Sequence, residues 1–242
     1  MAERKDDFPS PPQPGPAQNL DHCYLENFQK IYNRKGLSLR KRLLCGMSAL
    51  VATGDSGLLE SHFRFALERD IPLADICETL LQTYLFIGFP GAYKSLGLLA
   101  RVSGRKDLPD MPPYTASEQE RTAAGEALCK RVYGGNYEKL RKNISGLDPD
   151  FASWMINEGY GKILSRPLLD PCTRELITVA ALVATGRERQ LRSHIEGALN
   201  LGCTSGEVRE VILQTYLYAG FPAVIDALIL FRRIEEKRAQ GG

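Results

Sequence analysis

The stretch Ala181-Leu-Val-Ala-Thr-Gly186 decides the fold, because the same six residues occur earlier in the chain as Ala49-Leu-Val-Ala-Thr-Gly54. Further matches keep the same offset of 132 residues: Ser61-His62 returns as Ser193-His194, Leu81-Gln-Thr-Tyr-Leu85 as Leu213-Gln-Thr-Tyr-Leu217, and Gly88-Phe-Pro90 as Gly220-Phe-Pro222. Aligned without a gap, 23 of the 54 residue pairs between 49–102 and 181–234 are identical. A repeat of this length has the size of a small domain, far above that of a solenoid repeat, so the chain contains two copies of one module.

Each copy has the pattern of a set of helices. In the second copy, Asp170 before Pro171 supplies a capping acid and a proline at the first helical position, and apolar residues follow at helical spacing up to the glycine of the repeated stretch. A second helix is expected over about 188–200, and Thr204 with Glu207 forms a capping box that opens a third. Because few segments alternate polar and apolar residues, we predict an all-α fold of two tandem helical modules without significant sheet.

Two prolines, Pro90 and Pro222, lie within otherwise helical runs. Because Pro222 cannot donate a hydrogen bond to the carbonyl of Tyr218, we predict a kink in each run at the proline. A bend that serves packing explains such kinks better than a carbonyl freed for a ligand.

The chain divides into four segments. Residues 1–20 are polar and become rich in proline, which predicts a disordered arm. We assign 21–102 to the first copy, 103–116 to a polar, proline-rich linker, and 117–242 to the second copy. The second copy has about 35 residues before its repeat core, and these begin with a capping box and have the pattern of an amphipathic helix.

Composition argues against several classes of function. Hydrophobic residues make up 43% of the chain and charged residues 25%, and the net charge of +2 is too balanced to indicate a nucleic acid or an anionic membrane as a partner. No run of some twenty apolar residues and no signal peptide is found, so we expect a cytoplasmic protein. The six cysteines form no CxxC pair, and for that compartment we expect reduced, buried thiols.

The candidate chemistry centres on Glu175 and His194. They lie 11 residues before and 8 residues after Gly186, roughly 16 Å and 12 Å from that turn. If the two helices form a hairpin, the side chains come level to within about one turn, and a carboxylate beside an imidazole fixes its tautomer for acid–base work. A hydrogen bond that only holds the hairpin together is the alternative. In the first copy His62 is kept but Leu43 replaces the glutamate, so that copy is not expected to repeat the same proton chemistry.

Other candidate residues are weaker. Arg166 and Arg174 could bind an anionic substrate, although a salt bridge is the more usual role of such residues. Cys172 and Cys203 lie near helix starts, where the dipole lowers a thiol pKa, but neither has a resolving partner nearby in sequence. Three histidines without metal-binding spacing, and no P-loop, dinucleotide fingerprint or GxSxG elbow, leave no metal or cofactor site to predict.

In combination, these motifs resemble the carboxymuconolactone decarboxylase family of the alkyl hydroperoxidase D-like superfamily. The second copy follows the family's pattern over roughly 117–235, in the order Tyr160-Gly161, Arg166-Pro167-Leu168-Leu169-Asp170, Thr173-Arg174-Glu175-Leu176-Ile177-Thr178, Arg192-Ser193-His194 and Leu213-Gln214 through Gly220-Phe221-Pro222. The first copy matches in part, from Arg42 onward. Leu168 stands where the family usually has glycine.

The resemblance implies an all-helical fold that assembles into rings, commonly hexamers of single modules, so a fused pair would reach six modules as a homotrimer. It also implies cofactor-free loss of CO₂ from a small carboxylated lactone, a reaction that needs an anion site, oxyanion stabilisation and a proton donor. By this resemblance His194 is the proton donor or oxyanion partner and Glu175 orients it. Tyr160, Arg166 and Arg174 are the candidate substrate-binding residues.

Two other functions stay open. The chain could be a non-catalytic helical assembly or binding protein that retains a relict Glu175–His194 pair. It could also reduce peroxides, but the peroxidase relatives carry a CxxC between the matching glutamate and histidine, and those two positions are Arg187 and Gln190 here.

Overall fold

The computed structural model describes residues 18–105, 107–108 and 116–240, and every regular element in these ranges is helical, which confirms the predicted fold class. The first copy contains α1 (Gln18–Tyr32), α2 (Leu39–Thr53), α3 (Ser56–Glu68), α4 (Leu73–Ile87) and α5 (Phe89–Ser103). The second contains α6 (Glu118–Tyr133), η1 (Gly134–Asn136), α7 (Tyr137–Leu147), α8 (Pro149–Trp154), η2 (Met155–Leu164), α9 (Pro171–Thr185), α10 (Glu188–Asn200), α11 (Ser205–Gln214) and α12 (Tyr216–Gln240). Residues 1–17 of the predicted arm lie outside the described residues, as do 106 and 109–115 of the predicted linker, while 18–20 begin α1.

The helix starts predicted for the second copy are present. The Asp170 side chain accepts a hydrogen bond from the backbone N–H of Thr173, and Gly186 ends α9 with a φ of 63°, a left-handed conformation that glycine adopts without strain. Helix α10 covers 188–200 as expected, and the capping boxes at Ser117 and Thr204 are both formed. Local sequence therefore sets the ends of these helices.

The kinks predicted at the two prolines lie two residues earlier, at glycines. Gly88 and Gly220, each two residues before its proline, have φ values of 82° and 77° and interrupt the helical run. Pro90 then sits in the first turn of α5, where the missing N–H costs nothing. Among the described residues no single helix is long and apolar enough to cross a membrane, and α11 with α12 passes that test only as a pair bent by 119°.

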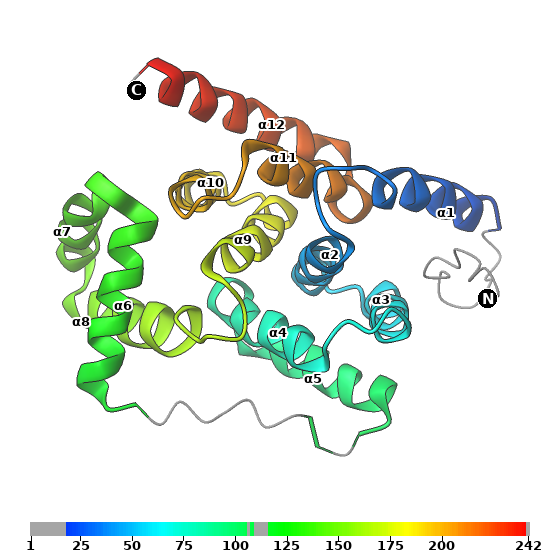
Figure 1. The fold of residues 1–242 in the computed structure, drawn as a ribbon, viewed down its shortest axis with the longest axis horizontal. Helices are drawn as coiled ribbons and strands as arrows, with labels where there is room; N and C mark the ends of the chain where they lie inside the picture. The colour runs from blue at the N-terminus through cyan, green and yellow to red at the C-terminus, as the bar shows by residue number, and fades with distance from the viewer. Residues whose placement is uncertain (1–17, 106, 109–115, 241–242) are drawn as a thin grey trace.

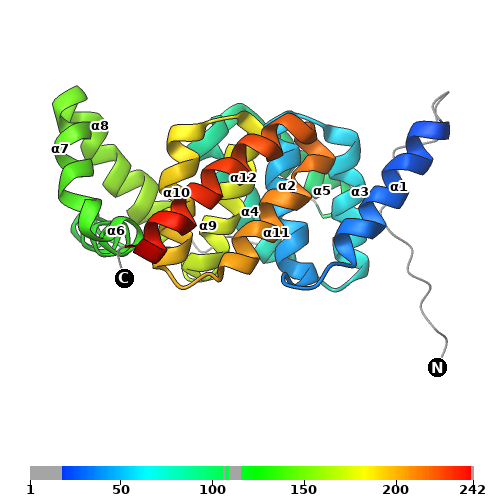
Figure 2. The same cartoon turned by 90° about the horizontal axis from the view of Figure 1, so that it is seen from above.

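The two copies pack as three layers of helices. The middle layer contains α2 and α9 side by side, with α3 and α10 outside them (Figure 1). Helices α4 and α5 cover one side of this layer and α11 with α12 cover the other. Viewed from above, α1 lies at one end of the molecule and α6 to α8 lie at the opposite end (Figure 2).

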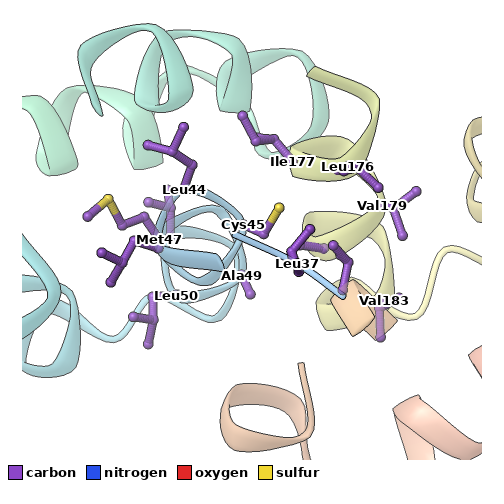
Figure 3. Packing of buried hydrophobic residues seen from close by; sticks show 14 of the residues in the cluster. Leu37, Leu44, Cys45, Met47, Ala49, Leu50, Leu176, Ile177, Val179 and Val183 are labelled. Atoms are coloured by element: carbon purple, nitrogen blue, oxygen red, sulfur yellow. The ribbon is translucent and has the colours of Figure 1, made fainter. Parts of the chain in front are cut away.

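The copies share one hydrophobic core. A single cluster of buried side chains includes residues of both, and the α2–α9 contact lies at its centre. Figure 3 shows Cys45 of α2 on the side of that helix that faces α9, with Ile177 of α9 beside it. The hydroxyl of Ser48 also donates to the carbonyl of Ile177 across this contact, at 2.9 Å. Because the apolar surface of each copy is buried against the other, neither copy is a separate folding unit.

Polar contacts between the copies are reciprocal. Gln82 of α4 donates its amide N–H to the carbonyl of Arg174 on α9, at 2.9 Å. The equivalent Gln214 of α11 donates to the carbonyl of Arg42 on α2, at 3.1 Å. A contact in which each partner offers the same residue to the same residue is typical of a two-fold interface, so the duplication has folded as a pseudo-dimer within one chain.

The extra segment of the second copy is anchored by two glycines. Helix α6 crosses η2, a stretch with the wide turn of a π-helix, where Gly125 meets Gly161. A methyl group on Gly125 would collide with the carbonyl oxygen of Ile156, and one on Gly161 with that of Arg121. The backbones can therefore touch only because neither residue has a side chain. In the first copy the counterpart of η2 lies within α1, which begins the described part of the chain.

One expectation about the cysteines is wrong. Cys172 and Cys203 form a disulfide, with a Cα–Cα distance of 5.5 Å. They are 31 residues apart in sequence, but the α9–α10 hairpin brings the start of α9 beside Cys203, three residues after the end of α10. Neighbourhood in sequence is therefore a poor guide to a resolving partner. Of the other cysteines, Cys23 is exposed, and Cys45, Cys77 and Cys129 are buried free thiols.

Candidate functional site

The α9–α10 hairpin brings Glu175 and His194 into direct contact. The ring N–H at Nδ1 of His194 donates to Oε2 of Glu175 at 2.8 Å, and the two side chains are 9% and 3% exposed. The predicted approach of these two residues is thus present as a hydrogen bond. A carboxylate in this position holds the ring in one orientation and fixes its tautomer.

The second ring nitrogen of His194 is available for chemistry. Its Nε2 has no hydrogen-bond partner among the described residues. The ring packs edge-on against Phe86 of α4, with 5.4 Å between the ring centroids. The first copy therefore contributes one apolar wall to the histidine of the second. An imidazole fixed at Nδ1 and open at Nε2 is the arrangement that proton transfer requires.

Two tyrosines lie beside the pair. Tyr160 of η2 and Tyr133 at the end of α6 pack edge to face, and their ring centroids are 6.3 Å apart. Burial raises the pKa of Tyr133 to about 12 and that of Tyr160 well above its usual range, and the nearby Glu175 charge raises both further. Both hydroxyls are therefore protonated at neutral pH and can act as donors.

Space for the glutamate comes from a glycine on the opposite helix. A Cβ at Gly197 would lie 3.0 Å from Oε2 of Glu175 and 2.6 Å from a methyl group of Val132. The equivalent residues of the first copy, Leu43 and Phe65, are both buried and apolar. The second copy thus differs from the first by two matched exchanges, one that supplies a carboxylate and one that makes room for it.

The histidine of the first copy has a different environment. Nδ1 of His62 bonds the carbonyl of Leu58 at 2.8 Å, and because a carbonyl only accepts, this nitrogen carries the proton. Nε2 then accepts from the hydroxyl of Tyr218 at 2.9 Å, and that oxygen accepts from Tyr32, also at 2.9 Å. Both ring nitrogens of His62 are occupied and the side chain is fully buried, so its role is structural.

This environment makes stability dependent on pH. Burial lowers the pKa of His62 to about 4, against about 6.5 in an unfolded chain. Between these values the unfolded chain binds a proton that the folded one excludes, so acidification favours unfolding. The contribution is complete above pH 6.5 and is lost as the pH falls towards 4, by about 3 kcal/mol in total. Denaturant titrations between pH 7 and 4 should show a smaller loss for His62→Gln than for the natural protein, and parallel curves would contradict this account.

The two arginines predicted to bind substrate lie in a buried ion cluster. Nη2 of Arg174 and Nε of Arg166 donate to the carboxylate of Glu78 on α4, at 2.6 Å and 2.7 Å. Arg174 also donates to Gln82 at 3.1 Å. The structure therefore joins these arginines to the other copy and does not bring them to the Glu175–His194 pair. Of the predicted substrate-binding residues it brings Tyr160 there, beside Tyr133, which sequence reasoning missed.

The same cluster is repeated at the equivalent place in the first copy. Glu210 of α11 accepts from Arg34 and from Arg42, each at 2.7 Å. The duplication thus produces two crossed arginine–glutamate–arginine clusters, one on each side of the α2–α9 contact. Over the parts of the chain that the structure describes, no group of three or more histidine, cysteine, aspartate or glutamate side chains could hold a metal ion.

A known protein family matches both copies of the module. The model of the Carboxymuconolactone decarboxylase family matches residues 21–101 and 149–233, so the matched segments fall in both copies and leave out α6 and α7. A 4-carboxymuconolactone decarboxylase of Acinetobacter baylyi is 35% identical over 108 residues, which is 44% of this chain and 81% of that protein. A nitrosuccinic acid decarboxylase of Metarhizium robertsii is 30% identical over 110 residues, 45% of this chain and 77% of that protein. Peroxisomal protein 2 of Schizosaccharomyces pombe is 29% identical over 140 residues, 54% of this chain and 62% of that protein.

Proposed function

Because the chain belongs to the carboxymuconolactone decarboxylase family, we propose that its second copy is a cofactor-free decarboxylase of a small carboxylated lactone or a related acid. The observation that carries the proposal is the buried Glu175–His194 hydrogen bond, which leaves Nε2 of the histidine open. Two relatives whose names give a decarboxylase activity support the reaction type.

The chemistry of the site suits this reaction. When the bond to the carboxylate carbon breaks, CO₂ leaves and the electron pair enters the lactone ring as an enolate. Hydroxyl donors held in a buried site stabilise that oxyanion, a role for which Tyr133 and Tyr160 are suitably protonated. Protonated His194 then gives its Nε2 proton to the carbon that lost CO₂, and Glu175 stabilises the imidazolium before that transfer. The histidine regains its proton from solvent.

The test is release of CO₂ from 4-carboxymuconolactone by the natural protein and by His194→Ala. Turnover that disappears in the variant supports the proposal. A ligand that binds equally well to both proteins, with no CO₂ released from this lactone or its close analogues, would instead indicate a binding or assembly protein. The Cys172–Cys203 disulfide is a reason to measure peroxide reduction in parallel. Peroxide reduction that depends on those cysteines would favour the thiol peroxidase alternative.

The proposal includes assembly as a homotrimer. Two apolar faces support it: Tyr84, Phe89 and Tyr93 lie on one, and the equivalent Tyr216, Phe221 and Ile225 lie on the other, with Phe89, Tyr93, Phe221 and Ile225 exposed. Exposed apolar patches of this kind mark contact sites between proteins. Because the faces are related by the duplication, one face of a subunit can meet the other face of the next and close a ring.

The expected mass in solution is about three times the 26.9 kDa of one chain. Light scattering measures it directly. Phe89→Glu with Phe221→Glu should reduce the mass to that of one chain, because a carboxylate on each face opposes the contact. A single-chain mass for the natural protein would contradict the assembly while leaving the decarboxylase proposal intact.

A further inference from the structure

A cavity of about 320 Å³ lies between α6, the end of η2 and the loop that leads into α9. We call it the α6 cavity. Its wall is mainly apolar, with Ala124, Leu128 and Leu169 among the lining residues, and it also includes Arg131, Arg166 and Asp170. Cavities of this size lie at the lower end of the range for small-molecule sites and hold about ten non-hydrogen atoms.

The α6 cavity exists because of the extra helix. At the equivalent place of the first copy, Arg34 is 42% exposed, whereas the side chain of Arg166 is 7% exposed. Helix α6 lies beside Arg166 and forms one wall of a partly open space, with successive turns of its inner face formed by Ala124, Leu128 and Arg131. The second copy therefore has a partly open pocket at the place where the first has an exposed arginine.

The charges around the α6 cavity favour an anion. Arg131 is exposed and makes no ion pair with the described residues. Arg166 belongs to the Glu78 cluster, in which two guanidinium groups face one carboxylate and leave one positive charge in excess. The Asp170 carboxylate, which caps α9 by accepting from the backbone and the hydroxyl of Thr173, offsets that excess, so Arg131 supplies the net positive charge. The N-terminus of α9, which also adjoins this space, adds a partial positive charge.

The α6 cavity is distinct from the Glu175–His194 pair. Neither residue lines it, and neither does Tyr133 or Tyr160. A small core cluster that contains Leu128, Tyr160 and Leu164 lies along the same α6–η2 contact. From this geometry we infer that the α6 cavity is a second binding site, for a small organic monocarboxylate whose apolar part packs on α6 and whose carboxylate meets Arg131.

The test is direct binding, measured by calorimetry with benzoate and with benzamide, its neutral counterpart of the same shape. Benzoate should bind the natural protein and benzamide should bind at least about tenfold more weakly, since benzamide lacks the negative charge that pairs with Arg131. Arg131→Gln should weaken benzoate binding by a similar factor. Lys130→Gln is the matched control, because it removes a positive charge from the residue just before Arg131 on α6, and Lys130 does not line the cavity.

Two further variants separate this site from the proposed active site. Ala124→Leu should abolish benzoate binding by filling the space, and Ala127→Leu, at a more exposed lining position, gives the same information if the first variant does not fold. His194→Ala should bind benzoate as the natural protein does. Two results would overturn the inference. One is loss of benzoate binding in His194→Ala while Ala124→Leu and Ala127→Leu still bind it, and the other is no binding to the natural protein at roughly 10 mM benzoate. Neither result depends on whether the protein decarboxylates anything.

Discussion

His194→Gln is expected to lower the rate of CO₂ release from the lactone by about 10³-fold, while the protein stays folded. The reason is that positioned proton transfer by a side chain contributes roughly 10²–10⁴-fold to a rate. Glutamine fills a similar volume and is neutral, but it cannot deliver a proton. The loss should appear in kcat, because the proton moves only after CO₂ begins to leave.

Glu175→Gln is expected to have a smaller effect, on the order of 10- to 100-fold. The amide oxygen of glutamine can still accept from Nδ1 of His194 and keep the ring in place, but it does not stabilise the charged imidazolium. The ratio of the two effects separates orientation from charge. Glu175→Ala removes both the hydrogen bond that orients the ring and the charge, so its rate of CO₂ release should fall to that of His194→Gln.

The duplication supplies the control for these variants. His62→Gln changes the equivalent residue of the first copy, whose ring nitrogens are both occupied, and should leave kcat within about twofold. Circular dichroism and the thermal midpoint of all variants identify any that have lost their fold. A folded His194→Gln protein with nearly full turnover would show that this histidine transfers no proton.

The features that sequence reasoning predicted are local ones. Helix ends follow from caps at Asp170 and Thr204, which act within a few residues and need no knowledge of the rest of the fold. The Glu175–His194 contact was predictable for a related reason, since both residues belong to one hairpin and their distances from its turn are nearly equal.

The features that it missed depend on which helices meet. The helical periodicity of α4 shows a buried face, but it does not say that Glu78 meets Arg174 of the other copy. Tyr133 was missed because α6 lies outside the repeat, so the comparison of the copies could not single it out. A difference between the copies can still point to such a contact. Where the first copy has Leu43 and Phe65, the second has Glu175 and Gly197, and the glycine makes room for the carboxylate.

Glu78→Gln is expected to destabilise the folded chain by about 4 kcal/mol, because it removes the buried carboxylate that Arg166 and Arg174 share. Glu78 has no exposed surface, and the side chains of its partners Arg166 and Arg174 are 7% and 1% exposed. A glutamine of nearly equal volume keeps the packing, so the loss reports the charge. Urea unfolding at a fixed protein concentration measures it.

Glu210→Gln removes the equivalent carboxylate and should cost less, about 2 kcal/mol, because one of its two partners, Arg34, remains in contact with water. Glu60→Gln at the exposed Arg64 pair is the baseline, with an expected change below about 0.5 kcal/mol. The difference between the losses of unfolding free energy in Glu78→Gln and Glu210→Gln therefore measures what covering of Arg166 by α6 adds to the ion cluster of Glu78. Equal costs for Glu78→Gln and Glu210→Gln would mean that covering Arg166 changes nothing in the stability of the fold. A larger cost for Glu78→Gln would show that α6, the helix that carries Tyr133, also contributes to the stability of the second copy.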